Sequence, residues 1–237
     1  MTFRLETVWN GFLDLLFPPK CPFCKTVLTR PGICDDCASD LPWNDADFRV
    51  IQGLRCAAPL RYEGAVRRTL LQFKFRGRVA AAEPLGNLLA RCAAERFSGL
   101  FDAVTYVPVS RERRRQRGYN QSELLARAAC RVWGTRPETL LVKIADNPPQ
   151  SGIPNAAARW KNVAGVYRPA PGQAMSGRRV LLIDDIRTSG ATLLECAKTL
   201  RDSGAAAVYA LTVAATSEKG ESGGDETRDD NATGPEK

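Results

Sequence analysis

The chain has 237 residues, a length that suits one globular domain with a small addition. Of these residues 44% are hydrophobic and 25% charged, a balance that excludes a disordered chain. No apolar run approaches the roughly 18 residues that a membrane-spanning helix needs. Residues 216–237 hold seven acidic and three basic side chains, which leaves 31 basic and 19 acidic ones, a net charge of +12, on residues 1–215. Such a charge favours phosphates or nucleic acid as partners, and a solvated basic surface is the alternative.

The first nineteen residues, MTFRLETVWNGFLDLLFPP, have apolar positions that are interrupted by Glu6, Asn10 and Asp14. No small-residue cleavage site follows them, so we expect an amphipathic helix and not a signal peptide. A chain without an export signal is expected in the cytoplasm, where thiols are kept reduced. Its eight cysteines are therefore expected to be metal ligands or core residues, not disulfides.

Four cysteines form two C-x₂-C pairs that are separated by nine residues of turn-like sequence. This spacing can bring four thiolates around one tetrahedral Zn²⁺, which would supply the folding free energy that so small a core lacks. Redox or iron–sulfur chemistry is the alternative, since C-x₂-C also occurs in both. The predicted ligands of a structural zinc are Cys21, Cys24, Cys34 and Cys37. The remaining cysteines, predicted to lie in the core, are Cys56, Cys92, Cys130 and Cys196.

From Leu70 the sequence alternates between helical patterns and short apolar runs. Helices are expected near 83–97 and 122–133, and strands at 103–107, 140–144, 180–183 and 207–213. Strands that are apolar on both faces and separated by helices indicate a parallel sheet covered by helices on each side, which is an α/β fold.

Two segments are not expected to form regular structure. Residues 146–161, DNPPQSGIPNAAARWK, contain three prolines and are expected to form a long loop that closes over a ligand. Residues 216–237 are poor in apolar side chains and are expected to be a disordered acidic tail. The predicted organisation is thus a helix and four-cysteine module over 1–50, the α/β domain over 51–215, and the tail.

The most informative stretch is VLLIDDIRTSGAT, residues 180–192. It predicts a buried strand with two carboxylates at its carboxyl end, followed by a small-residue turn that opens a helix. Ligands of parallel sheets bind at this edge, and a helix amino terminus offers N–H groups to an anion. The alternative is an ordinary strand-to-helix turn whose aspartates act as caps, but a cap needs one carboxylate and does not need the T-S-G-A-T that follows.

A second segment, VPVSRERRRQRGYNQSELLARA, covers residues 107–128 and has five arginines within positions 111–117. Guanidinium groups bind phosphate oxygens in bidentate fashion, so this loop could hold a leaving pyrophosphate or follow a nucleic-acid backbone. A solvated turn is the alternative. Tyr119, beside the arginines, is the one candidate here for stacking on a base.

The thirteen-residue stretch resembles the phosphoribosyl-pyrophosphate signature of type I phosphoribosyltransferases. That resemblance implies that Asp184 and Asp185 are the catalytic pair and bind the ribose hydroxyls. It also implies that the ribose 5-phosphate is held by Thr188, Ser189, Gly190, Ala191 and Thr192.

Together with the basic segment, Phe73-Lys74-Phe75 and residues 148–167 are similar to the ComF family, which joins a cysteine-rich module to a phosphoribosyltransferase-like domain. The resemblance covers most of residues 12–215. The matching positions are Pro108, Arg117, Gly118, Asn120, Gln121, Pro149, Gln150, Arg159, Asn162 and Val163. The residues expected to bind pyrophosphate or nucleic acid are Lys74, Ser110, Arg111, Arg117 and Gly118. Ser110 lies where relatives commonly have histidine, and the chain has none, so a histidine-dependent step is excluded.

The family resemblance implies a fold in which a type I phosphoribosyltransferase-like sheet is joined to a zinc-ribbon-like module. It implies binding of phosphoribosyl pyrophosphate with Mg²⁺, or of a nucleoside monophosphate-like ligand, and transfer of the phosphoribosyl group to an acceptor. The competing hypothesis is a non-catalytic competence protein that binds single-stranded DNA or DNA-uptake proteins. A third is a scaffold that docks a helicase-like partner of the uptake machinery.

Overall fold

The computed structural model describes residues 18–44, 48–147 and 161–216. The expected N-terminal helix, most of the 146–161 loop and the acidic tail lie outside these ranges. The main sheet has six strands in the order β1-β2-β8-β7-β4, with β3 also paired to β8. The strands are β1 (Phe48–Ile51), β2 (Leu54–Ala57), β3 (Leu60–Arg61), β4 (Ala103–Tyr106), β7 (Arg179–Arg187) and β8 (Ala207–Ala215). The first two pair antiparallel and all other pairs are parallel.

The centre of the sheet is the parallel pair β7 and β8, whose register places Ile183 beside Leu211. Alternate residues of β7 face opposite sides of the sheet: Leu181 and Ile183 belong to one core cluster, Val180 and Leu182 to the other. A strand that is buried on both faces needs apolar residues at every position, which is what the sequence supplies here.

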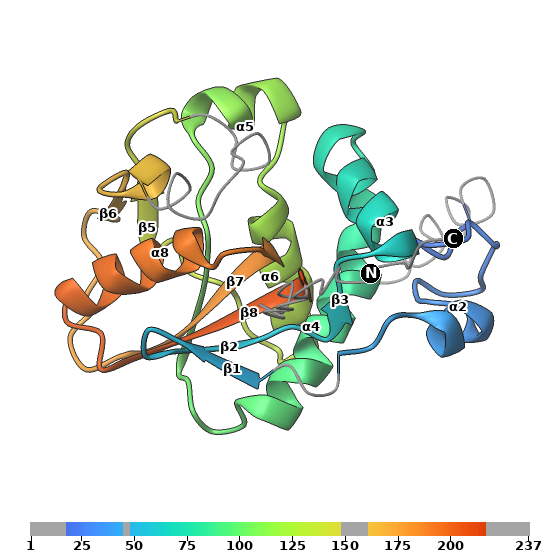
Figure 1. The fold of residues 1–237 in the computed structure, drawn as a ribbon, viewed down its shortest axis with the longest axis horizontal. Helices are drawn as coiled ribbons and strands as arrows, with labels where there is room; N and C mark the ends of the chain where they lie inside the picture. Colours follow the sequence, from blue (N-terminus) through green and yellow to red (C-terminus); the bar gives the residue numbers. More distant parts are fainter. Residues whose placement is uncertain (1–17, 45–47, 148–160, 217–237) are drawn as a thin grey trace, which may run out of the picture.

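Helices cover both faces of the sheet (Figure 1). One face packs against α3 (Gly64–Phe75), α4 (Ala82–Arg96) and α6 (Gln121–Val132). The other packs against α8 (Ala191–Asp202), together with a separate antiparallel pair formed by β5 (Leu141–Lys143) and β6 (Tyr167–Pro169). The remaining elements are α2 (Asp35–Asp40), the 3₁₀ turn η1 (Val79–Ala81) and α5 (Arg111–Arg117).

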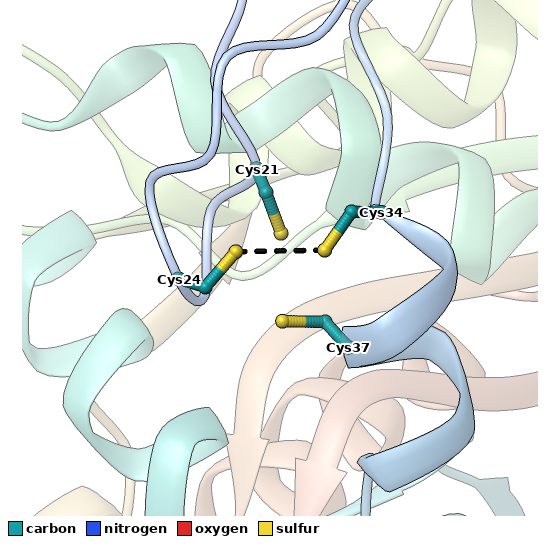
Figure 2. A group of neighbouring side chains, drawn as sticks. All are labelled: Cys21, Cys24, Cys34 and Cys37. Carbon is teal, nitrogen blue, oxygen red and sulfur yellow. Dashed lines mark hydrogen bonds between the residues drawn. The ribbon is translucent and has the colours of Figure 1, made fainter.

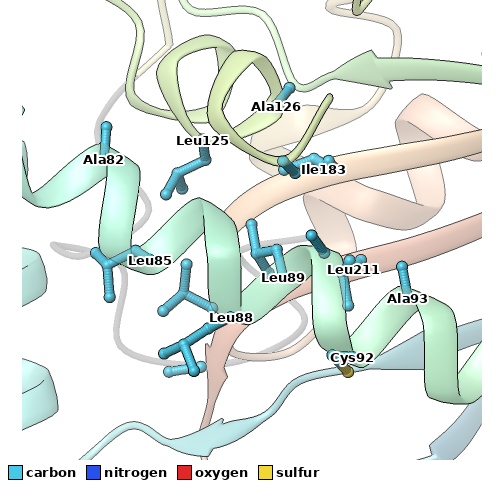
Figure 3. Packing of buried hydrophobic residues seen from close by; sticks show 14 of the residues in the cluster. Ala82, Leu85, Leu88, Leu89, Cys92, Ala93, Leu125, Ala126, Ile183 and Leu211 are labelled. Atoms are coloured by element: carbon cyan, nitrogen blue, oxygen red, sulfur yellow. The ribbon is translucent and has the colours of Figure 1, made fainter. Parts of the chain in front are cut away.

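Among the described helices, α4 and α6 share the most extensive contact (Figure 3). At its centre, a Cβ placed on Gly86 would lie 2.3 Å from the Cβ of Ala128. Only glycine lets the two helices approach this far, and Leu85 and Leu89 of α4 fill the space toward Leu125 and the sheet.

The predicted α/β class, with a mostly parallel sheet between helices, is confirmed, and the four remaining cysteines are buried as expected. The expectation for residues 140–144 was wrong in one respect. The strand does not join the main sheet but pairs antiparallel with β6, and Val142 and Lys143 are only partly buried. Antiparallel pairs tolerate one open face, so a short apolar run does not by itself indicate a place in a parallel sheet.

Candidate functional site

A cavity of about 420 Å³ lies at the carboxyl end of β7, where α3 and α5 rise above the sheet. The predicted site residues that line it are Lys74, Arg117, Asp184, Asp185, Thr188, Ser189, Gly190, Ala191 and Thr192. The predicted residues that do not line it are Ser110, Arg111 and Gly118. The structure therefore brings together three segments that are far apart in the sequence, at Lys74, Arg117 and residues 184–192.

The two aspartates at the end of β7 have different surroundings. Asp184 is buried, and its Oδ1 accepts hydrogen bonds from Ser122 Oγ at 2.7 Å and from the backbone N–H of Asp185 at 2.9 Å. Burial, and next the charge of Asp185, raise the pKa of Asp184 to about 7. Asp185 Oδ2 instead lies 3.4 Å from Nζ of Lys74. One carboxylate is thus held by hydroxyl and amide donors, and the other faces an ammonium group.

The backbone at Lys74 is held by two side chains, Tyr119 and Gln121, from the segment that follows α5. Gln121 Nε2 donates to the backbone oxygen of Lys74 at 3.1 Å, and the Tyr119 hydroxyl donates to the backbone oxygen of Phe73. The last carbonyls of a helix have no partner within it, so these side chains satisfy two of them. The end of α3 is thereby fixed beside Asp185.

The segment from Thr188 to Thr192 turns from β7 into α8. Gly190 has φ 77°, a left-handed conformation, and its position would bring a Cβ within 3.3 Å of Ile51 Cδ1. Glycine suits both the turn and the close approach. The first N–H groups of α8 follow directly and lie at the cavity, an arrangement that can receive a phosphate.

The basic segment was expected to be a loop, but it forms the short helix α5. Ser110 is its N-cap, accepting from Arg113 N at 3.3 Å, and Gly118 ends it at φ 80°. Arg113 and Arg117, one turn apart, line the cavity. A capped helix therefore places two of its five arginines toward the site.

The arginines of α5 have separate contacts. Arg113 donates to the backbone oxygen of Asn147, and the guanidinium carbon of Arg117 lies 5.0 Å from the ring centroid of Phe75. Arg114 does not line the cavity, and its Nη1 forms an ion pair at 3.0 Å with Oε2 of the buried Glu123. Arg111 is exposed.

Several cavity residues were not predicted. Lys143 and Tyr167 come from β5 and β6, with Lys143 Nζ 5.7 Å from the tyrosine ring centroid. Burial, and next the charge of Arg113, lower the pKa of Lys143 to about 8. Tyr62 and Ser122 also line the cavity. The only sequence signal for Ser122 was its place after Asn120 and Gln121 in the family-like segment.

The four predicted zinc ligands converge in the N-terminal module (Figure 2). Their sulfur atoms all lie within 4.8 Å of one another, and those of Cys24 and Cys34 are 3.5 Å apart. Tetrahedral Zn–S bonds of about 2.3 Å require sulfur separations of about 3.8 Å, so this donor set fits Zn²⁺. Hydrogen bonds with Thr26 lower the pKa of Cys24 to about 6, whereas burial raises the pKa of Cys37.

The cysteine module is anchored to the sheet and to α3. The Thr69 hydroxyl of α3 donates to the backbone oxygen of Pro22 at 3.1 Å, and Trp43 forms an isolated bridge with Leu60. The guanidinium carbon of Arg91 lies 5.0 Å from the centroid of the Trp43 ring. Nε1 of the same ring donates a hydrogen bond to the backbone oxygen of Ala38 at 2.8 Å. The module thus shares a core with the α/β domain.

The aspartates at the cavity fit Mg²⁺ less well than the four cysteines fit Zn²⁺. Mg²⁺ prefers six oxygen ligands in an octahedron. Asp184 and Asp185 provide carboxylate oxygens, but Lys74 lies against the second. Within the described ranges, the four cysteines are the one group of three or more side chains that could hold a metal ion. The side chains alone therefore do not form a Mg²⁺ site, and the ligand would have to supply most of the oxygens.

Comparison with protein-family models matches residues 12–66 to a double zinc ribbon domain. Within the described part of that range, one four-cysteine group is present, and the fifth cysteine, Cys56, is buried in β2. Together with the sulfur geometry, the match supports a structural zinc. Among the described helices, none combines the length and apolar character needed to cross a bilayer.

Solved structures give weaker matches. A phosphoribosylpyrophosphate synthetase from Mycobacterium smegmatis is 15% identical with a TM-score of 0.36, over 56% of this chain and 33% of that one. The glutamine phosphoribosylpyrophosphate amidotransferase from B. subtilis is 24% identical with a TM-score of 0.38, over 56% of this chain and 26% of that one. The chain thus matches no more than a third of either structure.

Curated relatives cover most of the chain. The competence protein ComFC of Bacillus subtilis is 25% identical over 79% of this chain and 73% of its own length. The DNA utilization protein YhgH of Escherichia coli K12 is 31% identical over 79% and 80%, and competence protein F of Haemophilus influenzae is 32% identical over 78% and 80%. At this identity and coverage, the chain belongs to the ComF/YhgH family of competence and DNA utilization proteins.

Proposed function

We propose that the cavity binds phosphoribosyl pyrophosphate, or a ligand like a nucleoside monophosphate, and that the protein transfers the phosphoribosyl group to an acceptor. The observation that supports this most is the convergence on one cavity of Asp184, Asp185 and the turn into α8 with cations that include Lys74 and Arg117. The carboxylates suit ribose hydroxyls, the N–H groups at the start of α8 suit the 5-phosphate, and the cations suit pyrophosphate.

In the proposed reaction, the bond from ribose C1 to the pyrophosphate oxygen breaks and a bond from C1 to the acceptor nucleophile forms. The electron pair leaves with the pyrophosphate, where Arg117, Arg113 and Lys74 draw off the developing charge. The ionised aspartates hold the ribose hydroxyls and orient C1 toward the acceptor. Mg²⁺ enters this proposal as the counter-ion that the pyrophosphate carries, and we assign no step to it.

Lys74 would change partners on binding. Before a ligand arrives, its ammonium group lies beside Asp185. A pyrophosphate carries more charge than one carboxylate, so Lys74 would move toward it and leave Asp185 to accept the ribose hydroxyls. Tyr119 and Gln121 fix the backbone of α3 while the flexible lysine side chain moves.

The cellular role that we propose is the one that the relatives' names describe, competence and the use of DNA. The proposal also places the protein in the cytoplasm, because reduced thiols there remain available to bind zinc. The predicted division at residues 50 and 215 is part of the same proposal.

The test is calorimetric titration of the zinc-loaded protein with phosphoribosyl pyrophosphate and Mg²⁺. The double variant Asp184→Asn, Asp185→Asn should lose at least about tenfold in affinity, since hydrogen bonds to charged groups contribute about 1.5–3 kcal/mol each. Asp202→Asn is the matched control, because Asp202 is exposed at the far end of α8 and pairs with Lys198. Equal affinity in the double variant, or no binding to the wild type, would overturn the proposal. Release of pyrophosphate in the presence of candidate bases then tests the transfer step.

A further inference from the structure

The helix α5 has no buried side chain to fix its orientation. All seven of its residues, Arg111–Arg117, are partly or fully exposed. A surface helix is usually oriented by an apolar stripe that packs on the core. The helix α5 has no such stripe, because it consists of five arginines, one glutamate and one glutamine. Its polar contacts must therefore decide which of its arginines face the cavity.

Two of the arginines face the cavity and a third faces α6. Arg113 and Arg117, which are four positions apart and thus on one face of the helix, line the cavity. Arg114 is the next residue after Arg113, about 100° further around the helix axis. Its Nη1 lies 3.0 Å from Oε2 of Glu123, in the first turn of α6. This ion pair holds a second side of α5 against the body of the protein.

Glu123 is a buried carboxylate that does not line the cavity. Only 7% of the residue is exposed, and it is not among the residues of the cavity wall. Its Oε1 accepts hydrogen bonds from Nε and Nη2 of Arg127, on the same helix, at 3.0 and 2.8 Å. Its Oε2 pairs with Arg114. A carboxylate is costly to bury unless it is paired, so one that reaches across to α5 without lining the cavity indicates a role in placing that helix.

We propose that Glu123 and Arg114 are positioning residues that make the cavity selective for a ligand with a pyrophosphate group. Their ion pair fixes the rotation of α5 about its axis, so that Arg113 and Arg117 point to the place where the pyrophosphate of phosphoribosyl pyrophosphate binds. Neither member of the pair touches the ligand. The inference rests on the proposed function, because it concerns the pyrophosphate part of that same site.

The selectivity follows from the two ends of the ligand. In the proposed function, the 5-phosphate binds at the start of α8, which follows β7 and not α5. Loss of the ion pair should therefore weaken the binding of phosphoribosyl pyrophosphate and spare ribose 5-phosphate, which has no pyrophosphate. A variant that merely loosened the fold would weaken the binding of both ligands.

The experiment is calorimetric titration of the zinc-loaded protein with phosphoribosyl pyrophosphate and Mg²⁺, and separately with ribose 5-phosphate. Arg114→Gln should lower the affinity for phosphoribosyl pyrophosphate about tenfold, the effect of one hydrogen bond to a charged group. The affinity for ribose 5-phosphate should not change. Arg115→Gln is the matched control, because it removes the same charge from the same helix at an exposed residue that does not line the cavity. It should leave both affinities nearly unchanged.

Further variants test whether the ion pair acts through the arginines that line the cavity. Arg114→Lys keeps a cation beside Glu123 and should recover most of the affinity. Glu123→Gln should show the same selective loss as Arg114→Gln, and its melting temperature reports whether the fold is intact. In a chain that already carries Arg117→Gln, adding Arg114→Gln should cost less affinity than Arg114→Gln does alone, because one of the positioned cations is already absent.

Amide hydrogen exchange of residues 111–118 in the unliganded protein measures the positioning of α5 without any ligand. Exchange across α5 should be faster in Arg114→Gln than in Arg115→Gln, since only the first loses the contact with α6. Equal exchange in the two variants would overturn the inference. It would also be overturned by equal affinities for phosphoribosyl pyrophosphate in the two variants, by an equal loss of both ligands in Arg114→Gln, or by a wild type that does not bind ribose 5-phosphate.

The two proposals can fail separately. If neither ligand binds the wild type while exchange across α5 is still faster in Arg114→Gln, the proposed function fails and the selectivity fails with it, but the positioning of α5 by Glu123 stands. If both ligands bind and Arg114→Gln matches Arg115→Gln in every measurement, the proposed function stands and the positioning role is wrong.

Discussion

The hydroxyl of Ser122 donates a hydrogen bond of 2.7 Å to Oδ1 of Asp184, joining the first turn of α6 to the end of β7 across 62 residues of sequence. Both residues are buried, so the bond is only slightly exposed to water. It fixes one oxygen of the carboxylate and opposes the rise in pKa that burial produces. Ser122 therefore influences when Asp184 is ionised as well as where it points.

Removing this hydroxyl should shift the pH dependence of ligand binding. Ser122→Ala removes a donor that stabilises the ionised carboxylate, so the pKa of Asp184, about 7 in the wild type, should rise further. If ionised Asp184 accepts the ribose hydroxyls, the midpoint for binding phosphoribosyl pyrophosphate moves up by about half to one pH unit. Calorimetry between pH 6 and about 9 measures it. Ser122→Thr retains a hydroxyl and should retain the midpoint, whereas an unchanged midpoint in Ser122→Ala would show that the bond has no such effect.

Asp184 should lower the stability of the fold at neutral pH. Its pKa in the folded protein, about 7, lies above the ordinary value of 3.8 for an aspartate, so the folded protein binds more protons than the unfolded chain. The free energy of unfolding from this group therefore falls as pH rises from about 4 to 7. Asp184→Asn keeps an oxygen to accept from Ser122 and should stabilise the protein by about 1–3 kcal/mol at pH 8, with little effect at pH 4. Denaturant unfolding at the two pH values checks this, and an equal effect at both would contradict it.

The cysteine module should hold one zinc ion per chain. Elemental analysis should find one zinc, not the two that a double ribbon could carry, because the described residues form one four-cysteine group. Cys34→Ser should lose the metal and lower the melting temperature, and a chelator should do the same to the wild type. Cys92→Ser, in α4 and away from the group, should keep its zinc. Full zinc content in Cys34→Ser would rule out this ligand set.

The contact between α4 and α6 should not accept a methyl group. Gly86→Ala would place its Cβ 2.3 Å from that of Ala128, so the helices must separate. We expect a loss of about 1–3 kcal/mol in unfolding free energy, as is common for overpacked cores. The double variant Gly86→Ala, Ala128→Gly should recover part of it, which a double-mutant cycle would detect. Additive effects would mean that the two positions do not meet.

The central fold could be predicted because its signals are local. The strand at 180–183 and the helices at 83–97 and 122–133 agree with β7, α4 and α6 to within a few residues, since continuous apolar runs and helical periodicity lie within each segment. The helix α3 was missed, because Arg67 and Arg68 near its start interrupt the apolar periodicity that would have indicated it. The helix α5 was also missed, because it has no apolar periodicity and its residues are almost all charged. The features that mark it in the sequence are only its two capping residues, Ser110 and Gly118.

The candidate site was predictable only in part. Asp184, Asp185 and the following turn form one contiguous motif, so a sequence reader can find them together. Ser122, Lys143 and Tyr62 reach the cavity through pairings between distant segments, and no spacing rule connects them. The carboxylate beside Lys74 likewise depends on how α3 lies against β7, and the aromatic ring beside Arg117 depends on how α3 lies against α5.

The packing of the cysteine module sets a limit on how the chain can be divided. Leu41 belongs to the core cluster that contains Val66 and Leu70 of α3, and Phe23, Ile33 and Trp43 pack against it. Truncation near residue 50 would remove Leu41 and these three side chains and expose an apolar patch on the remaining fragment. A fragment beginning there would be prone to aggregate, so ligand-binding measurements belong on the whole 237-residue chain with its metal bound.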